Sequence, residues 1–275
     1  MTEYFGISRQ AFYKAEQKLQ EKLLSEQLAL SMVKDIRIRQ PKIGVKKLYY
    51  LLSKDLRLMP HKIGRDALFN LLRRNSLLIR RKHRRFSTTN SSHMNKIYPN
   101  LIKDLKITKP NQVLISDITY IRLINGFTYL SVVADLYSRK ILGYYISRDL
   151  SLKGPLRALK LCLEKIGSCL MPGMIHHSDR GVQYSSFVYI DVLKKHGINI
   201  SMSAKGNPYD NAVMERIIGI LKAEFLLDDT FKNISMVKKA LKEAVLIYNE
   251  ERPHLSLNYK TPTEVYNVND NKDAA

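Results

Sequence analysis

The sequence contains no tryptophan and only two cysteines, Cys162 and Cys169. Neither cysteine has partner cysteines or clustered histidines at the spacing of a zinc site. No segment approaches the roughly 18 apolar residues that cross a bilayer, and the first ten residues lack the apolar core of a secretory signal. We therefore expect a reduced, cytoplasmic protein with no membrane partner.

Acidic residues are also scarce: 25 Asp and Glu stand against 46 Lys and Arg, a net charge of +21. Residues 1–100 hold 22 basic and 7 acidic side chains, so this third carries +15 of the excess. Basic side chains that neutralise phosphates release counterions, and a nucleic acid is therefore the expected partner. A basic but inert surface is the alternative.

The N-terminal region, residues 1–92, has helix-favouring stretches and no alternating strand pattern. Two segments resemble helix-turn-helix units: a turn Phe5–Ser8 before a helix Arg9–Gln17 capped by Ser8, and a turn Arg39–Gly44 before a helix Val45–Leu52. We expect this region to bind DNA. Ordinary helical hairpins share the pattern and remain an alternative.

A dense basic segment, residues 80–85, follows these helices. Like charges repel, so such a segment is stable in solvent or against phosphate. DNA contacts are expected from Arg80, Arg81, Lys82, Arg84 and Arg85, with a solvated linker as the alternative. Residues 93–109 are predicted as a linker between domains, and residues 267–275 as a disordered tail.

From residue 110 the sequence changes to runs of β-branched and aromatic residues, typical of strands. Asn125-Gly126 predicts a hairpin turn. The predicted strands are Val113–Leu123, Phe127–Leu136, Lys140–Ile146, Met174–His177 and Ile198–Ser201. The predicted helices are Leu152–Ile166, Ser186–His196, Asn211–Phe225 and Met236–Glu250. This order predicts an α/β domain over 110–266, a mixed five-stranded sheet flanked by helices.

Three carboxylates have positions suited to a metal site. Asp117 lies among apolar residues in the first strand, so it must be solvated, paired or metal-bound. Asp179 closes a short strand, and Glu215 lies in the first turns of a helix, where the dipole favours a carboxylate. Mg²⁺ prefers such oxygen ligands, and two ions can hold both reacting oxygens of a phosphodiester. Each carboxylate alone also has a structural explanation: a hydrogen-bonded strand Asp, a turn former and a surface Glu.

With their neighbours, these carboxylates resemble bacterial insertion-sequence transposases of the IS-three type, within the retroviral integrase superfamily. The resembling motifs are Asp117-Ile118-Thr119-Tyr120, His177-Ser178-Asp179-Arg180-Gly181 with Gln183-Tyr184, Ser201-Met202-Ser203 with Gly206, Asp210-Asn211-Ala212 with Glu215, Leu221-Lys222 with Glu224, and Tyr248-Asn249 with Arg252-Pro253-His254. The 35 residues between Asp179 and Glu215 match the family's spacing. The resemblance covers residues 110–265, and more loosely 35–90. Leu114 departs from the Trp of many relatives, and we expect it to pack in the core.

The resemblance implies a ribonuclease H-like fold and metal-dependent DNA strand cleavage and strand transfer. Asp117, Asp179 and Glu215 would be catalytic and would hold Mg²⁺ or Mn²⁺, two ions in all. The implied partners are terminal inverted repeats, target DNA, further copies of the chain and an upstream-frame helix-turn-helix protein. The protein would be bacterial and nucleoid-associated when bound to DNA. A catalytically inactive DNA-binding derivative or repressor, and a ribonuclease or junction nuclease on the same fold, remain alternatives.

Three further residues accompany the carboxylates. Lys222 is seven residues after Glu215, on the same helix face, and the resemblance suggests that it contacts DNA near the scissile phosphate; a solvated lysine is the alternative. Asn211, one turn before Glu215, is expected to orient that residue or the DNA. His177 points to the side of Asp179 in a regular strand, where it either hydrogen-bonds a carboxylate or packs as a satisfied histidine.

Asp135 is a rival carboxylate at the end of the second predicted strand. Its surroundings also suit a turn or a pair with Arg139, and we favour a structural role. The segment Arg252-Pro253-His254 follows the last predicted long helix, and the sequence alone assigns it no chemical role.

Overall fold

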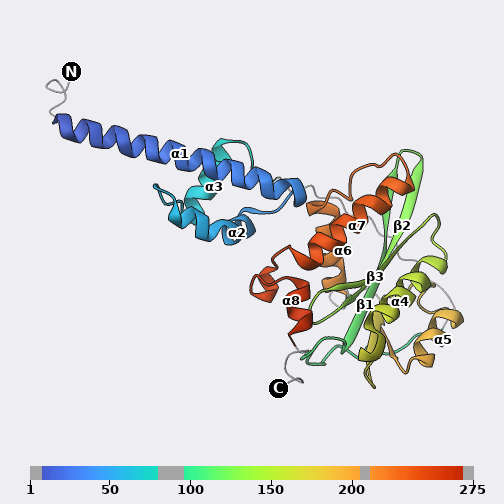
Figure 1. Cartoon of the computed structure of the whole chain (residues 1–275). Helices are drawn as coiled ribbons and strands as arrows, with labels where there is room; N and C mark the ends of the chain where they lie inside the picture. Colours follow the sequence, from blue (N-terminus) through green and yellow to red (C-terminus); the bar gives the residue numbers. More distant parts are fainter. Residues whose placement is uncertain (1–7, 80–95, 205–210, 269–275) are drawn as a thin grey trace. The chain divides into compact units, whose positions relative to one another are not determined.

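A computed structural model of the chain describes residues 8–79, 96–204 and 211–268. They fall into two compact units, Met1–Arg81 and Lys82–Ala275, which are described separately (Figure 1). No helix in the described ranges is both long enough and apolar enough to span a membrane.

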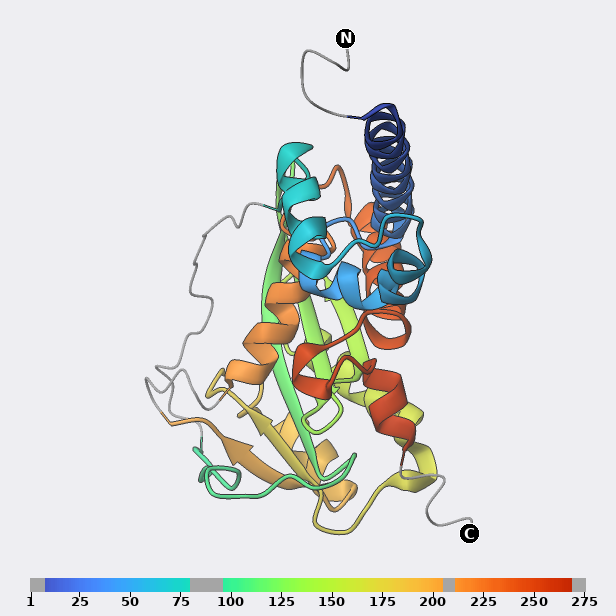
Figure 2. The ribbon, with the colours of Figure 1, turned by 90° about the vertical axis from the view of Figure 1, so that its left-hand side faces the viewer.

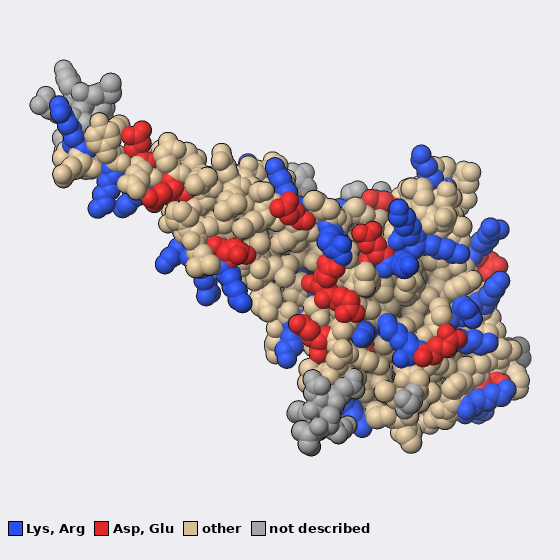
Figure 3. All heavy atoms as spheres, in the orientation of Figure 1, with Lys and Arg blue, Asp and Glu red and all other residues tan. Residues whose placement is uncertain are grey.

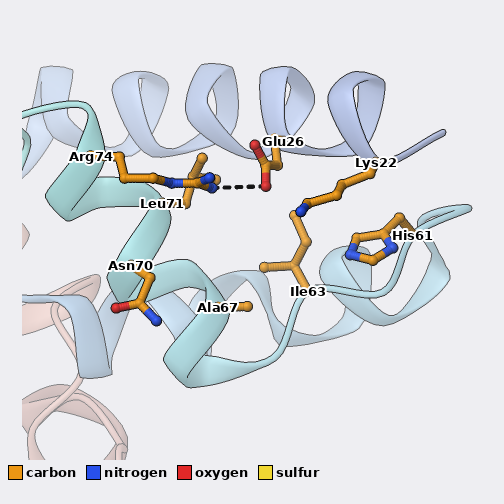
Figure 4. A pocket seen from close by; sticks show the side chains of 8 residues that line it. All are labelled: Lys22, Glu26, His61, Ile63, Ala67, Asn70, Leu71 and Arg74. Carbon is orange, nitrogen blue, oxygen red and sulfur yellow. Dashed lines mark hydrogen bonds and ion pairs between the residues drawn. The ribbon is translucent and has the colours of Figure 1, made fainter. Parts of the chain in front are cut away.

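The first unit is helical and consists of α1 (Arg9–Arg39), α2 (Val45–Leu58) and α3 (Arg65–Arg74). Apolar side chains of all three helices share one core, including Ala29, Val33, Leu48, Leu52, Leu56, Leu68, Leu71 and Leu72. Between α1 and α3 lies a hollow where Arg74 pairs with Glu26 at 2.9 Å (Figure 4). This ion pair fastens α3 to the middle of the long helix.

The start of α1 agrees with the sequence prediction, but its end does not. Ser8 caps the helix as predicted, because its Oγ accepts the N–H of Ala11 at 3.2 Å. The predicted end at Gln17 is wrong: no glycine or proline interrupts the helix formers before Arg39. The predicted turn Arg39–Gly44 does separate α1 from α2. The turn at residues 5–7 lies outside the described residues.

The second unit is a mixed five-stranded sheet flanked by helices, as the sequence predicted. Its strands are β1 (Val113–Leu123), β2 (Gly126–Asp135), β3 (Ile141–Ser147), β4 (Ile175–Ser178) and β5 (Asn199–Met202), in the order β3-β2-β1-β4-β5. The first three strands pair antiparallel, and β4 and β5 add in parallel. The helices are α4 (Lys153–Ile166), α5 (Phe187–Lys195), α6 (Ala212–Glu224), α7 (Ile234–Glu250) and α8 (Pro262–Asn267), with short 3₁₀ turns η2 (Gly167–Cys169) and η3 (Leu255–Leu257).

The central strand β1 is buried on both faces because its two sets of alternate residues pack against different helices. Val113, Ile115 and Ile121 share a core with residues of α6 and α7. Leu114 and Ile118 share a second core with α4 and α5. Leu114 is fully buried there, as expected for the position where relatives often have Trp. Figures 1 and 2 show the sheet between these two helical layers.

The β1–β2 hairpin follows the predicted turn. The two strands pair up to Leu123 and Gly126, and Gly126 has a φ of +104°. Such a backbone conformation favours glycine, which explains the Asn125-Gly126 signal in the sequence.

Candidate functional site

Asp117 and Asp179 are brought together by the parallel pairing of β1 and β4. The register pairs Val113 with Ile175 and Ile115 with His177. The same offset continued by two residues sets Asp117 opposite Asp179, just beyond the end of β4. By alternation, Asp117 lies on the face of β1 that packs against α6.

Glu215 approaches the same face from α6. The helix begins at Ala212, and the N–H of Glu215 donates to the carbonyl oxygen of Asn211 at 3.1 Å. Glu215 is therefore in the first turn, as predicted, and its side chain is exposed. Met214, Ile217, Ile218 and Leu221 of α6 are buried against the sheet, so the helix carries Glu215 at a fixed position relative to β1.

Asp117 feels the charge of both other carboxylates. Burial, first, and the negative charges of Asp179 and Glu215 together raise the pKa of Asp117 to about 8. The N–H of Ile118, which donates to Asp117 Oδ1 at 2.7 Å, and the ammonium of Lys222 act in the opposite direction. Acidic groups thus converge here with one lysine as the recorded counter-charge.

The loop after β4 holds Asp179 in place. Its Oδ1 accepts the N–H of Gly181 at 2.9 Å. A Cβ on Gly181 would lie 2.9 Å from that same oxygen, so a larger residue would displace the carboxylate. The glycine of the Asp-Arg-Gly motif is therefore explained by this close approach.

Lys222 lies farther along α6 than Glu215. Its Nζ is 4.4 Å from the centre of the Tyr120 ring, a cation–π contact. Burial lowers the pKa of Lys222, and the charges of Asp228 and Asp117 oppose that effect. The predicted DNA-contacting lysine is thus half-buried beside Asp117, and its contact with DNA stays a prediction.

A buried polar network that the sequence did not predict joins β1, β4 and α5 next to the carboxylates. His176 Nε2 is 2.8 Å from Ser116 Oγ and 3.0 Å from the Tyr189 hydroxyl. Burial lowers the pKa of His176 to about 3, so this imidazole is neutral. Tyr184 packs edge-on against Tyr189 with ring centres 5.3 Å apart. The repeated His-His before Asp179 was the only signal of this network.

His177 is fully buried on β4, and its Nδ1 lies 2.8 Å from Ser201 Oγ on β5. This contact joins the last two strands beside the carboxylates. It matches the alternative of a packed, hydrogen-bonded histidine.

Asp135 has a structural role. It is fully buried and accepts the N–H of Asn111 at 2.8 Å, the N–H of Ser138 at 2.7 Å and the Ser138 hydroxyl at 2.6 Å. These bonds close the connection between β2 and β3. Arg139 instead donates to the carbonyl of Leu136.

Residues at the end of α7 and just after it support α6 and β3. Arg252 is buried and donates twice to Glu224, at 2.9 Å and 2.8 Å, which ties down the end of α6. Asn249 forms two bonds with the backbone of Ile141, accepting at 2.9 Å and donating at 3.0 Å. Arg252 therefore has an assignable role: it holds the helix that carries Glu215 and Lys222.

Comparison with known proteins agrees with this architecture. Residues 107–208 match a family model described as an integrase core domain, and residues 196–262 match a second model of the same description. A 31 kDa protein of insertion element IS600 from Shigella sonnei is 34% identical over 268 residues, covering 95% of this chain and 96% of that protein. The chain belongs to the insertion-sequence transposases of the IS3 type.

Further proteins are similar to parts of the chain. The transposase InsF of IS3A from Escherichia coli is 33% identical over 189 residues, 68% of this chain and 65% of that protein. The catalytic core of HTLV-2 integrase, solved with magnesium, is 19% identical, with a TM-score of 0.43 over 57% of this chain and 97% of that one.

The carboxylates of this transposase suit a hard divalent cation in donor chemistry and charge. Their oxygens are the ligands that Mg²⁺ and Mn²⁺ prefer, and a cation would relieve the repulsion felt by Asp117. Within the described ranges, no three His, Cys, Asp or Glu residues are already grouped closely enough to hold an ion. The fit therefore rests on the donors and their convergence.

Of the residues predicted to contact DNA, the structure describes Asn211 but not the basic segment. Asn211 is at the N-cap position of α6, next to Glu215. Arg80, Arg81, Lys82, Arg84 and Arg85 lie outside the described residues, as do residues 205–210 before α6 and residues 269–275 of the predicted tail. On the face drawn in Figure 3, basic and acidic side chains are interspersed on both units.

Proposed function

We propose that this chain cleaves DNA strands and joins them to a target by metal-dependent phosphoryl transfer. The observation that supports this most is the placement of Asp117 opposite Asp179 on adjacent parallel strands, with Glu215 approaching from α6. A carboxylate of β1, one just after β4 and one in the first turn of α6 would together form the site. Membership of the transposase family supports DNA as the substrate.

Asp117, Asp179 and Glu215 would hold the cation, Mg²⁺ or Mn²⁺. A bound pair of such ions would activate a water or a 3′ hydroxyl and stabilise the leaving oxygen of a phosphodiester. Burial and the charges of Asp179 and Glu215 raise the pKa of Asp117, and a bound cation would offset both effects. Lys222 would place its ammonium against a phosphate beside Asp117, and Asn211, whose side chain makes no capping bond in α6, would orient Glu215 or the DNA.

The wider DNA contacts and partners belong to the same proposal. The basic N-terminal third, including Arg80, Arg81, Lys82, Arg84 and Arg85, would bind the DNA backbone by charge. Joining two ends of an element requires that two DNA ends meet, so we expect further copies of the chain on the DNA. An upstream-frame helix-turn-helix protein would help to recognise the terminal repeats.

The test is a strand-transfer assay with the DNA that flanks the chain's own coding sequence. Purified full-length protein is compared with Asp117→Asn, Asp179→Asn and Glu215→Gln, with Glu243→Gln, an exposed carboxylate of α7, as the matched control. Each site variant should lose at least about a hundredfold in rate in Mg²⁺, because the ion loses a ligand. The control should keep its activity.

Two outcomes would contradict the proposal. Strand transfer that survives Asp117→Asn would show that the carboxylates are not the catalytic ligands. Wild-type protein that binds the DNA but never cuts it in Mg²⁺ or Mn²⁺ would favour the inactive DNA-binding derivative. An RNA–DNA hybrid included as a third substrate separates a ribonuclease from a transposase.

A further inference from the structure

Two aromatic rings and two cations form a continuous cluster on the β1–β2 hairpin, beside the carboxylates. We call Tyr120, Arg122, Phe127 and Lys222 the hairpin patch. Lys222 Nζ is 4.4 Å from the centre of the Tyr120 ring, and the Tyr120 and Phe127 rings meet edge to face at 5.2 Å. The Arg122 guanidinium lies 5.8 Å from the centre of the Phe127 ring. Along the patch, the two rings thus lie between the two cations.

The backbone holds the patch in place. Arg122 and Phe127 are partners in the register of β1 and β2, so their side chains share one face with Tyr120. The segment between α6 and α7 pairs with the end of the hairpin: Ile124 N–H donates to Phe231 O at 2.9 Å, and Phe231 N–H donates to Arg122 O at 3.0 Å. Lys222 comes from α6, whose end Arg252 holds. The patch is therefore built on paired backbone.

The outer part of the patch is open to solvent. Phe127 is 48% exposed, and Arg122 is exposed. Within the described part of the chain, Arg122 has no recorded ion pair with a carboxylate. An exposed aromatic ring beside a cation offers a base-stacking surface next to a phosphate contact, the combination found in single-strand DNA sites.

We propose that the hairpin patch binds the DNA strand next to the scissile phosphate, with an unpaired base stacked on Phe127 and phosphates on Lys222 and Arg122. The patch starts where the proposed chemistry is: Lys222 interacts with both Tyr120 and Asp117. By alternation Tyr120 and Arg122 lie on the opposite face of β1 from Asp117, so Lys222, which reaches from α6 to both sides, is the link between the patch and the carboxylates. This inference rests on the proposed function, because it assigns the patch to the same DNA.

The charge and position of the patch favour nucleic acid over a protein partner. Two cations flank the rings, and a phosphate backbone needs such a charge along its path. Stacking on Phe127 requires a base that has left the duplex, so the patch predicts a preference for DNA whose end is unpaired. A fully paired end would use the cations but not the ring.

The test measures that preference directly. Full-length protein without divalent metal is titrated onto two labelled DNA ends of the same sequence, one fully paired and one with mismatched terminal nucleotides. Phe127→Ser should reduce the preference for the unpaired end about tenfold, whereas Phe127→Tyr should keep it. Phe187→Ser, an 83% exposed aromatic of α5, is the matched control and should behave as wild type.

The cations are tested by salt dependence. Arg122→Gln should weaken binding to both ends and lower the slope of log affinity against log salt by about one. Arg157→Gln, an exposed arginine of α4, should leave the slope unchanged. Equal affinity of wild type for both DNA ends, or Phe127→Ser with the full preference, would overturn the inference. A Phe127→Ser variant that loses affinity equally for both ends would do the same.

The design separates this inference from the proposed function. Binding is measured without metal, and repeated in an Asp117→Asn background, so failure to cut DNA does not affect it. If the wild type transfers strands and Phe127→Ser keeps the preference, only the patch is wrong. If Phe127→Ser loses the preference and no variant ever cuts, the patch stands and the catalytic proposal falls.

Discussion

Asp117 and Asp179 stand opposite each other on two neighbouring parallel strands, although 61 residues separate them in the chain. The pairing of β1 with β4 ends at Ile115 and His177, and the two carboxylates come two residues later, where β4 has ended. The continued register sets the two carboxylates on one face at the same level of the sheet, and each accepts a backbone N–H, from Ile118 and from Gly181. This relationship generates the repulsion that the first prediction measures.

Asp117 should make the metal-free protein less stable as pH rises. The pKa of its folded form is about 8, against about 4 in an unfolded chain. The folded state thus holds the proton more tightly, and its contribution is present below about pH 4 and lost as pH rises through about 8. Because the carboxyl group is half-buried and partly screened, we expect about 1–3 kcal/mol in total.

Asp117→Asn removes this dependence. Thermal unfolding in a chelator should show the variant gaining on wild type between pH 5 and pH 8, with no gain for the exposed control Asp104→Asn. Added Mg²⁺ should then stabilise wild type and not the variant. Parallel pH curves for the two proteins would show that Asp117 is not protonated as described.

Asp135→Asn should separate structure from catalysis. An amide presents one acceptor and two donors, so it cannot accept the three bonds from Asn111 and Ser138. We expect a loss of about 2 kcal/mol in urea unfolding, with strand transfer per folded molecule unchanged. A stable variant without activity would instead make Asp135 a member of the catalytic site.

Arg252→Met should destabilise the second unit by about 3 kcal/mol, because it leaves the carboxylate of Glu224 without its partner. The double variant Arg252→Met with Glu224→Leu should recover part of that loss, since no unpaired charge remains. Urea unfolding followed by circular dichroism measures both, with Arg157→Met as the exposed control. A single variant as stable as wild type would show that the pair contributes little.

Two glycine substitutions should have opposite signs. A Cβ on Gly143 would lie 2.1 Å from the carbonyl oxygen of Ala158, so Gly143→Ala must push α4 away from β3 and should cost about 3 kcal/mol or prevent folding. Gly219 lies exposed in α6 with nothing within 4 Å of that position. Gly219→Ala should stabilise the protein by about 0.5–1 kcal/mol. Thermal unfolding measures the stability of both variants. A Gly143→Ala variant as stable as wild type would contradict this packing.

The sheet was largely predictable from the sequence because its signals are local. Alternating β-branched residues and the Asn125-Gly126 turn predict β1 and β2 almost to the residue. The first turn of α6, with Glu215, was also predictable from the loop residues before it. The length of α1 was not, because a weakly amphipathic helix without glycine or proline offers no stop signal before Arg39.

The supports of the site could not be predicted, since they join segments far apart in the chain. Arg252 and Glu224 are 28 residues apart, and Asn249 reaches Ile141 over 108. Nothing local marks either partner, because each pair depends on how α7 lies against the sheet. The register of β1 against β4 was equally unpredictable. Alternation shows which residues of a strand share a face, but not which residue of the neighbouring strand each one pairs with.

The clamp of Arg252 on Glu224 also bears on how copies of such a gene decay. All three carboxylates are encoded before codon 216 and α6 ends at Glu224, so a frameshift or early stop between codons 225 and 252 leaves both the carboxylates and that helix in the reading frame. The product would nevertheless lack the guanidinium that fastens the helix bearing Glu215. An inventory of carboxylates alone would count such a copy as functional, although the helix that presents the third one would have lost its anchor.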